Sequence, residues 1–240
     1  MMIRILPAPA LAIILSAAPA GGQSIDSIFA TYDNRQSPGC AVSAVDGDRT
    51  LVLKGFGMAS LEHDLPITPQ SAFYAASVSK QFTAFSVALL AQQGKLSLDD
   101  DVRKWLPEIP NFGKTITVRH LIHHTSGLRD YFGLLGMTGW PNDGPVTEAQ
   151  FLDLVSRQKA LNFDPGARHL YSNTGYVLLS ILVKRVSGQS LRDFAAASIF
   201  KPLGMNNTHF HDDHEEIVKN RAYSYSSAGP GGGLKAAPLN

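Results

Sequence analysis

Hydrophobic residues along the chain follow a strand pattern in one early region and a helical pattern around it. Two β-rich runs, Cys40 to Val45 and Thr50 to Phe56, are joined by Asp46-Gly47-Asp48-Arg49, and an Asp-Gly between such runs predicts a β-hairpin. Apolar residues at helical spacing predict helices over 25–35, 79–93, 118–124, 148–157, 173–187 and 191–200. Because segment 79–93 is apolar on nearly all sides, we expect its helix to be buried. This order predicts an α+β domain whose sheet is only partly present.

The first twenty residues have the pattern of a signal peptide. One positive charge within 1–4 is followed by an apolar stretch over 5–18, and Ala18-Pro19-Ala20 supplies the small residues that a signal peptidase requires. The stretch is short for a transmembrane anchor and is broken by prolines. The sequence therefore predicts a signal peptide over 1–20 and one domain over 21–240, exported to the periplasm or the medium, with no stable membrane anchor after cleavage.

Composition and charge exclude some functions. The chain has 240 residues, 44% of them hydrophobic, which is enough to bury a sizeable core. With 21 basic and 20 acidic residues its net charge is +1, so no strong positive field favours nucleic acid. The single cysteine, Cys40, cannot close an internal disulfide and is interpreted as a small apolar residue on a strand.

The candidate chemistry begins at Ser77-Val78-Ser79-Lys80, where a loop enters the helix predicted over 79–93. Residues three apart share a helix face, so the side chains of Ser77 and Lys80 can meet. A lysine held against a partly desolvated surface can accept or relay the proton of the serine. The plainer alternative is a serine that caps the helix, followed by a surface lysine.

A second candidate group is Tyr171-Ser172-Asn173, which follows a Pro165-Gly166 turn and precedes an apolar helix. A phenol near a lysine can be stabilised as a phenolate and serve as a general base. The amide of Asn173 can orient a substrate or the lysine. The alternative is a packed tyrosine followed by an asparagine that caps the next helix.

The chain resembles the serine β-lactamases and penicillin-binding proteins, in particular the class C-like group that includes esterases and D-amino-acid peptidases. The resemblance runs from about Pro38 to the C-terminus. Its motifs are Gly55-Phe-Gly-Met-Ala-Ser-Leu-Glu-His63, Ser77-Val-Ser-Lys-Gln-Phe-Thr-Ala84, Leu121-Ile-His-His-Thr-Ser-Gly-Leu128, Pro165-Gly166, Tyr171-Ser-Asn-Thr-Gly-Tyr176 and Pro202-Leu-Gly-Met205. It implies an antiparallel sheet flanked by helices, beside an all-helical lobe. It also implies that Ser77 is acylated, that Lys80 and Tyr171 move protons and that Asn173 binds substrate.

One motif of that family is missing. Neither Lys-Thr-Gly nor His-x-Gly occurs after Tyr171, and no strand-rich segment after Phe200 is long enough to complete a sheet. The glycines of Gly229 to Gly233 are interpreted as flexible chain. We therefore expect the C-terminal strands of the family to be absent from this chain, which would then be an inactive or feeble enzyme.

The leading interpretation is a serine hydrolase with a small-molecule or peptide substrate. The main alternative is a non-catalytic relative that at most binds ligand. The minor alternative is a zinc hydrolase using His209-Phe-His-Asp-Asp-His214, whose spacing could bind zinc. A solvated loop is the favoured interpretation of that segment, so no metal, cofactor or protein partner is predicted. His123 and His124 are assigned capping or core hydrogen bonds.

Overall fold

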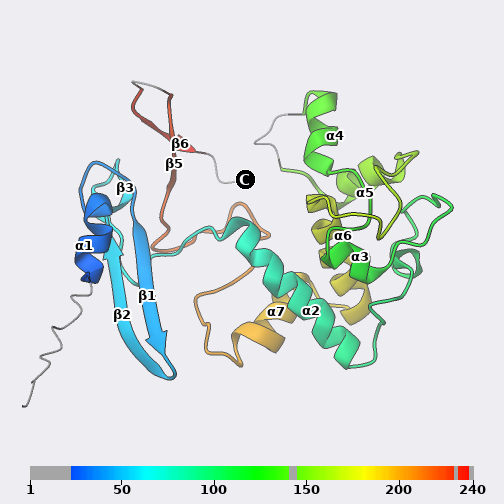
Figure 1. Ribbon diagram of the computed structural model, residues 1–240, viewed down its shortest axis with the longest axis horizontal. Coiled ribbons are helices and arrows are strands. Elements are labelled where there is room, and N and C mark those ends of the chain that lie inside the picture. The colour runs from blue at the N-terminus through cyan, green and yellow to red at the C-terminus, as the bar shows by residue number, and fades with distance from the viewer. Residues whose placement is uncertain (1–22, 141–144, 230–231, 238–240) are drawn as a thin grey trace, which may run out of the picture. The chain divides into compact units, whose positions relative to one another are not determined.

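The computed structural model describes residues 23–140, 145–229 and 232–237 (Figure 1). The predicted signal peptide over 1–20 lies outside the described residues. The chain divides into two compact units, Met1–Thr68 and Pro69–Asn240, which are considered separately. In the part of the chain that the structure describes, no helix has the length and apolarity needed to cross a membrane.

The first unit contains the predicted hairpin. Strands β1 (Cys40–Asp46) and β2 (Arg49–Phe56) pair antiparallel around Gly47, whose φ of 56° suits the tight turn, so the hairpin prediction is confirmed. The helix predicted over 25–35 is shorter, with α1 at Ile25–Phe29 and a 3₁₀ turn at Ala30–Tyr32. Just beyond them, the Asn34 side chain donates a hydrogen bond to the carbonyl of Thr31, a local contact that competes with helix extension.

A second antiparallel pair follows, formed by β3 (Met58–Ser60) and β4 (Leu65–Pro66). The chain passes very close to itself here, because a Cβ placed on Gly55 would lie 2.2 Å from the carbonyl oxygen of Ile67. Only glycine fits at such a position.

The second unit is mostly helical, and its helices follow the predicted segments closely. They are α2 (Lys80–Gln92), α3 (Val118–Ile122), α4 (Tyr131–Thr138), α5 (Glu148–Ser156), α6 (Asn173–Ser187) and α7 (Leu191–Ala195), with 3₁₀ turns at Ala76–Ser79 and Val102–Lys104 and a π turn at Ala196–Phe200. Helix α4 is the one that the sequence did not predict. It contains Gly133 and Gly136, yet Asp130 caps it by accepting a hydrogen bond from the backbone N–H of Phe132.

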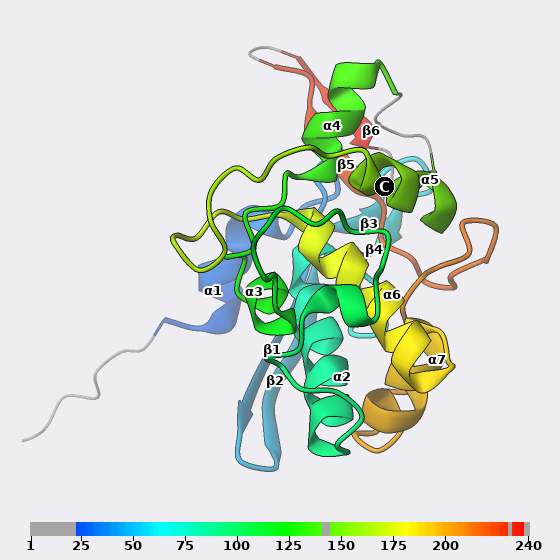
Figure 2. The ribbon, with the colours of Figure 1, turned by 90° about the vertical axis from the view of Figure 1, so that its right-hand side faces the viewer.

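The core of this unit lies where α2, α6 and α7 run beside one another (Figure 2). Leu90 of α2 packs with Leu178 and Leu182 of α6, and all three are fully buried. Helix α2 is not buried on every side as predicted, because Phe85 keeps 46% of its surface exposed. The buried residues of α2 fix the rotation of the helix about its axis. They thereby fix the direction of the side chains at its N-terminus.

The end of the described chain contains strands that the sequence did not predict. Strand β5 (Ser224–Ser227) pairs antiparallel with β6 (Leu234–Ala237), and the glycines interpreted as flexible chain lie in the connection between them. The backbone N–H of Ala228 donates to the carbonyl of Gly233 at 2.9 Å, which closes the hairpin. Four-residue strands of small and polar residues carry little of the hydrophobic alternation that a sequence pattern detects.

Candidate active site

Ser77 lies in the 3₁₀ turn that leads into α2, and Lys80 is the first residue of that helix. The Lys80 Nζ donates a hydrogen bond to the Ser77 Oγ at 3.0 Å, so the expected i, i+3 contact is present. The residue before the serine, Ala76, has a φ of 45°, which is strained for a residue other than glycine. Such strain is typical of functional sites, where the surrounding structure holds a side chain in one position.

Tyr171 brings a phenol to the same hydroxyl. Its oxygen lies 2.7 Å from the Ser77 Oγ, and the Lys80 Nζ lies 5.1 Å from the centre of its ring. Burial acts to raise the pKa of Tyr171. Hydrogen bonds with Lys80 and Ser77, together with the positive charge of Lys80, outweigh burial and bring this pKa below its ordinary value of 10. The phenolate is therefore easier to form here than in solution.

Asn173, the first residue of α6, completes the group around the lysine. Its Oδ1 accepts a hydrogen bond from the Lys80 Nζ at 3.1 Å. Its backbone N–H and its side-chain Nδ2 both donate to one carboxyl oxygen of Asp130, the latter at 3.1 Å. These two bonds fix the amide with its oxygen towards Lys80. Asp130 is not among the residues predicted from the sequence, although an aspartate just before a helix is a recognisable cap.

His124 packs against the ring of Tyr171. Its ring stacks on the Tyr171 ring with 4.5 Å between centroids, and its Nδ1 accepts the backbone N–H of Ser172 at 3.2 Å. Burial and the neighbouring His169 lower the pKa of His124, which favours the neutral ring that this hydrogen bond requires. The histidine was assigned a capping or core role from sequence, and its contact with the tyrosine was missed.

Three of these residues, Ser77, Lys80 and Asn173, line a pocket of about 300 Å³. Ser77, Lys80 and Asn173 form its polar wall, while Tyr131 and Phe132 of α4 lie among the aromatic residues of its lining. A hydroxyl in hydrogen-bond contact with a lysine and a tyrosine, at the wall of a pocket, has the arrangement of an activated nucleophile. All four predicted site residues are thus brought together, with His124 and Asp130 behind them.

Comparison with known proteins places the chain in a family. The β-lactamase family model matches residues 25–240. Penicillin-binding protein 4* of Bacillus subtilis is 35% identical over 204 residues, and the alignment covers 84% of this chain and 45% of that protein. A D-aminopeptidase of Gluconobacter oxydans is 33% identical over 170 residues, covering 70% of this chain and 31% of that protein.

The same relationship is seen in solved structures. The octameric penicillin-binding protein homologue from Pyrococcus abyssi superposes with a TM-score of 0.73 at 34% identity, over 85% of this chain and 47% of that chain. The chain thus spans less than half the length of each of these three relatives. Its mixture of helices and small antiparallel sheets is that of the β-lactamase and transpeptidase-like fold. The chain belongs to the β-lactamase family.

Proposed function

We propose that the chain is a serine hydrolase that acts through an acyl-enzyme formed on Ser77. One observation carries the proposal: the Ser77 Oγ is in hydrogen-bond contact with both the Tyr171 oxygen, at 2.7 Å, and the Lys80 Nζ, at 3.0 Å. A serine is a weak nucleophile unless a neighbouring group takes its proton. Here the Tyr171 oxygen lies where it can take that proton, and the positive charge of Lys80 favours the phenolate that does so.

The reaction begins when the Ser77 Oγ attacks the carbonyl carbon of the substrate and its proton passes to the oxygen of Tyr171. The positive charge of Lys80 favours the phenolate that receives this proton. Tyr171 then returns the proton to the departing group as the bond to the carbonyl carbon breaks. A water molecule, deprotonated by the same route, cleaves the ester on Ser77 and restores the serine.

The substrate class is an amide, an ester or a β-lactam, because each presents an electrophilic carbonyl with a leaving group. Names of relatives support this class, since they include penicillin-binding proteins and a D-aminopeptidase. The aromatic part of the pocket lining, with Tyr131 and Phe132, is suited to an apolar group beside that carbonyl.

The test is covalent labelling followed by measurement of the intact mass. The chain is exposed separately to a fluorophosphonate, which loses fluoride when a serine oxygen attacks its phosphorus, and to a penicillin. One adduct per chain is expected, and it should vanish in Ser77→Ala. The matched control is Ser79→Ala, because the Ser79 hydroxyl donates to the carbonyl of Ala76 at 2.6 Å and should not react.

An adduct that persists in Ser77→Ala would contradict the assignment of the nucleophile. Reversible binding of the penicillin without any added mass from either probe would support the non-catalytic alternative instead. The added mass is read from the spectra, and reversible binding of the penicillin is measured separately by isothermal titration calorimetry.

We also propose that the protein is exported. The proposal rests on the charge and apolar pattern of residues 1–20 and on the small residues at Ala18 and Ala20. Export would expose the pocket to extracytoplasmic substrates.

A further inference from the structure

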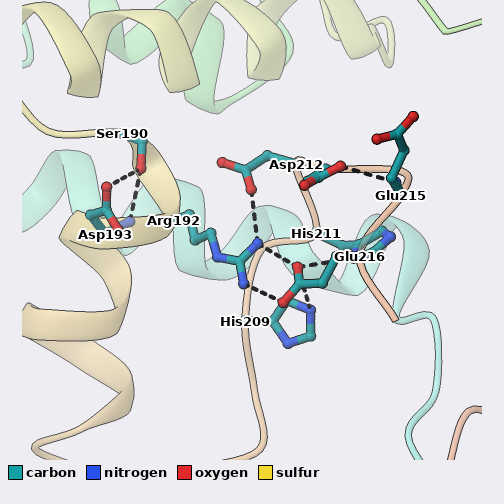
Figure 3. Close-up of polar contacts among 9 residues, drawn as sticks. Ser190, Arg192, Asp193, His209, His211, Asp212, Glu215 and Glu216 are labelled. Carbon is teal, nitrogen blue, oxygen red and sulfur yellow. Dashed lines mark hydrogen bonds and ion pairs between the residues drawn. The ribbon is translucent and has the colours of Figure 1, made fainter. Parts of the chain in front are cut away.

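The segment from His209 to Glu216, which follows the family motif ending at Met205, holds a group of side chains that the proposed hydrolysis does not use. His209 Nε2 and His211 Nδ1 lie 3.9 and 3.7 Å from the same oxygen, Oε2 of Glu216 (Figure 3). The three ligand atoms all lie within 4.8 Å of one another. His214, the last histidine of the sequence pattern, is not part of this group.

The Nε2 atom of His209 is buried and has no hydrogen-bond partner among the described residues. Buried polar atoms in folded proteins are nearly always paired, so an unpaired one requires an explanation. This ring nitrogen faces a carboxylate and a second imidazole, and no described residue donates a hydrogen bond to it. A metal ligand would be placed in the same way. This observation is independent of the residue types in the segment.

The charged side chains around the group have a net negative charge, which favours a cation. Arg192 of α7 donates to both oxygens of Glu216, at 2.6 and 2.7 Å, and to Asp212 at 3.0 Å. Arg192 and Glu216 form an ion pair at 2.6 Å, in which Glu216 is the carboxylate partner. Two carboxylates share one guanidinium, which leaves an excess of negative charge.

The contact with Arg192 does not block the carboxylate. Each carboxylate oxygen has two lone pairs, so Oε2 of Glu216 can accept from Arg192 and still bind a metal with the other. The arginine also holds the carboxylate in place, which is the usual task of a group behind a metal ligand.

Two imidazole nitrogens and one carboxylate oxygen are the ligand set of zinc sites. In a tetrahedral zinc site with bonds of about 2.05 Å, neighbouring ligand atoms lie about 3.4 Å apart. The separations of 3.7 and 3.9 Å to Oε2 therefore need only small side-chain movements to close around the ion. We propose that His209, His211 and Glu216 form a Zn²⁺ site whose fourth position is open to water.

A bound ion would anchor this segment to the helical unit. Phe210, between the two histidines, packs against Phe200 with 6.1 Å between ring centroids, so the segment is already anchored at one point. A Zn²⁺ ion would add a second anchor, linked through Glu216 to Arg192 on α7. Metal bound only to the folded protein raises its stability as the metal concentration increases.

The experiment is a titration of the full chain with Co²⁺ and Zn²⁺ after treatment with EDTA, using untagged protein because a polyhistidine tag binds both ions. Co²⁺ reports its ligand geometry through its visible absorption. We expect one equivalent of Co²⁺ to bind with the intense bands of a tetrahedral site, to be displaced by Zn²⁺, and to bind equally well in Ser77→Ala. Thermal unfolding should shift to higher temperature when Zn²⁺ is added.

The variants distinguish this site from non-specific binding. His211→Ala, which removes a side chain with 27% of its surface exposed, should weaken Co²⁺ affinity at least about tenfold, since loss of a group behind a ligand already costs 10–100-fold. His209→Gln should weaken it similarly. The matched control is His214→Ala, which removes an exposed histidine from the same segment and should leave the affinity within about twofold.

Two results would overturn the proposal. One is a wild-type chain that shows no tetrahedral Co²⁺ spectrum. The other is an equal loss of affinity in His211→Ala and His214→Ala, which would show that the segment binds metal without the geometry described. If His209→Gln fails to fold, the comparison of His211→Ala with His214→Ala still decides the matter.

Discussion

Replacing Lys80 by methionine should raise the pKa of Tyr171. The substitution removes a positive charge that lies 5.1 Å from the centre of the tyrosine ring and keeps a side chain of similar length. A nearby cation favours the charged form of a phenol, so its presence lowers the pKa of Tyr171 and its removal must raise it. The sign is therefore fixed by the geometry.

The size of the shift follows from the distance. At about 5 Å, two unit charges interact by roughly 0.8 kcal/mol in bulk water and by roughly 3 kcal/mol at the effective dielectric constant near a protein surface. Because Tyr171 is 45% exposed, solvent screens the pair and the lower part of this range applies. We expect Lys80→Met to remove roughly 1 kcal/mol of this interaction and thereby to raise the pKa of Tyr171.

The assay is a difference titration of tyrosinate absorbance. The chain has seven tyrosines, so the titration of Tyr171 is obtained by subtracting the curve of Tyr171→Phe from that of the wild type. The same subtraction is made in the Lys80→Met background. Lys95→Met is the matched control, because Lys95 is exposed in the turn after α2, and it should leave the pKa of Tyr171 unchanged.

A pKa of Tyr171 that stays the same or falls in Lys80→Met would refute the argument that Lys80 stabilises the phenolate. A rise of equal size in Lys95→Met would show that general surface charge, and not the contact at the site, is responsible. In either case the proton route through Tyr171 would need another explanation.

Two further predictions concern the site and its scaffold. Substitution of Lys80 or Tyr171 alone should slow acylation by about 10²–10⁴, and the double variant should be scarcely slower than the poorer single one because the two residues share one task; stopped-flow kinetics in which the two losses multiply would contradict this. Gly127→Ala should lower the free energy of unfolding by more than about 2 kcal/mol, since its Cβ would lie 2.1 Å from the carbonyl oxygen of Phe163 at a φ of 75°. In urea titrations, Gly188→Ala, with a φ of 74° and no described atom within 4 Å, should cost only about 1 kcal/mol, and equal losses would show that the close contact is unimportant.

Local patterns predicted those parts of the fold that local physics determines. The hairpin around Gly47 was predicted because an Asp-Gly turn between β-rich runs has few other conformations. Helix α6 (Asn173–Ser187) was predicted with its observed bounds because its apolar residues repeat at helical spacing and Gly188 ends it with a positive φ. Helix α4 was missed because Gly133 and Gly136 weaken its helical propensity, and its packing and its Asp130 cap determine the outcome instead.

The site divides in the same way. Ser77 and Lys80 are three residues apart, so their contact follows from helix geometry. Tyr171 is 94 residues from Ser77, and no spacing rule brings the two together; its place came from the resemblance to a family. The bond from Asp130 to Asn173 and the contact of His124 with Tyr171 were not predicted, because the N–H groups that these two residues hold, those of Asn173 and Ser172, belong to the backbone and leave no mark in the sequence.

His124 and Asp130 explain why the reacting groups can be exposed and still be well placed. Tyr171 is 45% exposed, so burial alone does not hold its ring. Instead His124 stacks on one face of the ring and also binds the next backbone N–H, so the ring and the chain that carries it are fixed by one side chain. Asp130 does the same for Asn173 through a backbone and a side-chain donor. Since all these contacts are made by residues of the Pro69–Asn240 unit, the orientation of the proton-handling groups is a property of that unit. A substitution at His124 or Asp130 should therefore act on catalysis through the position of Tyr171 or Asn173, without touching the substrate.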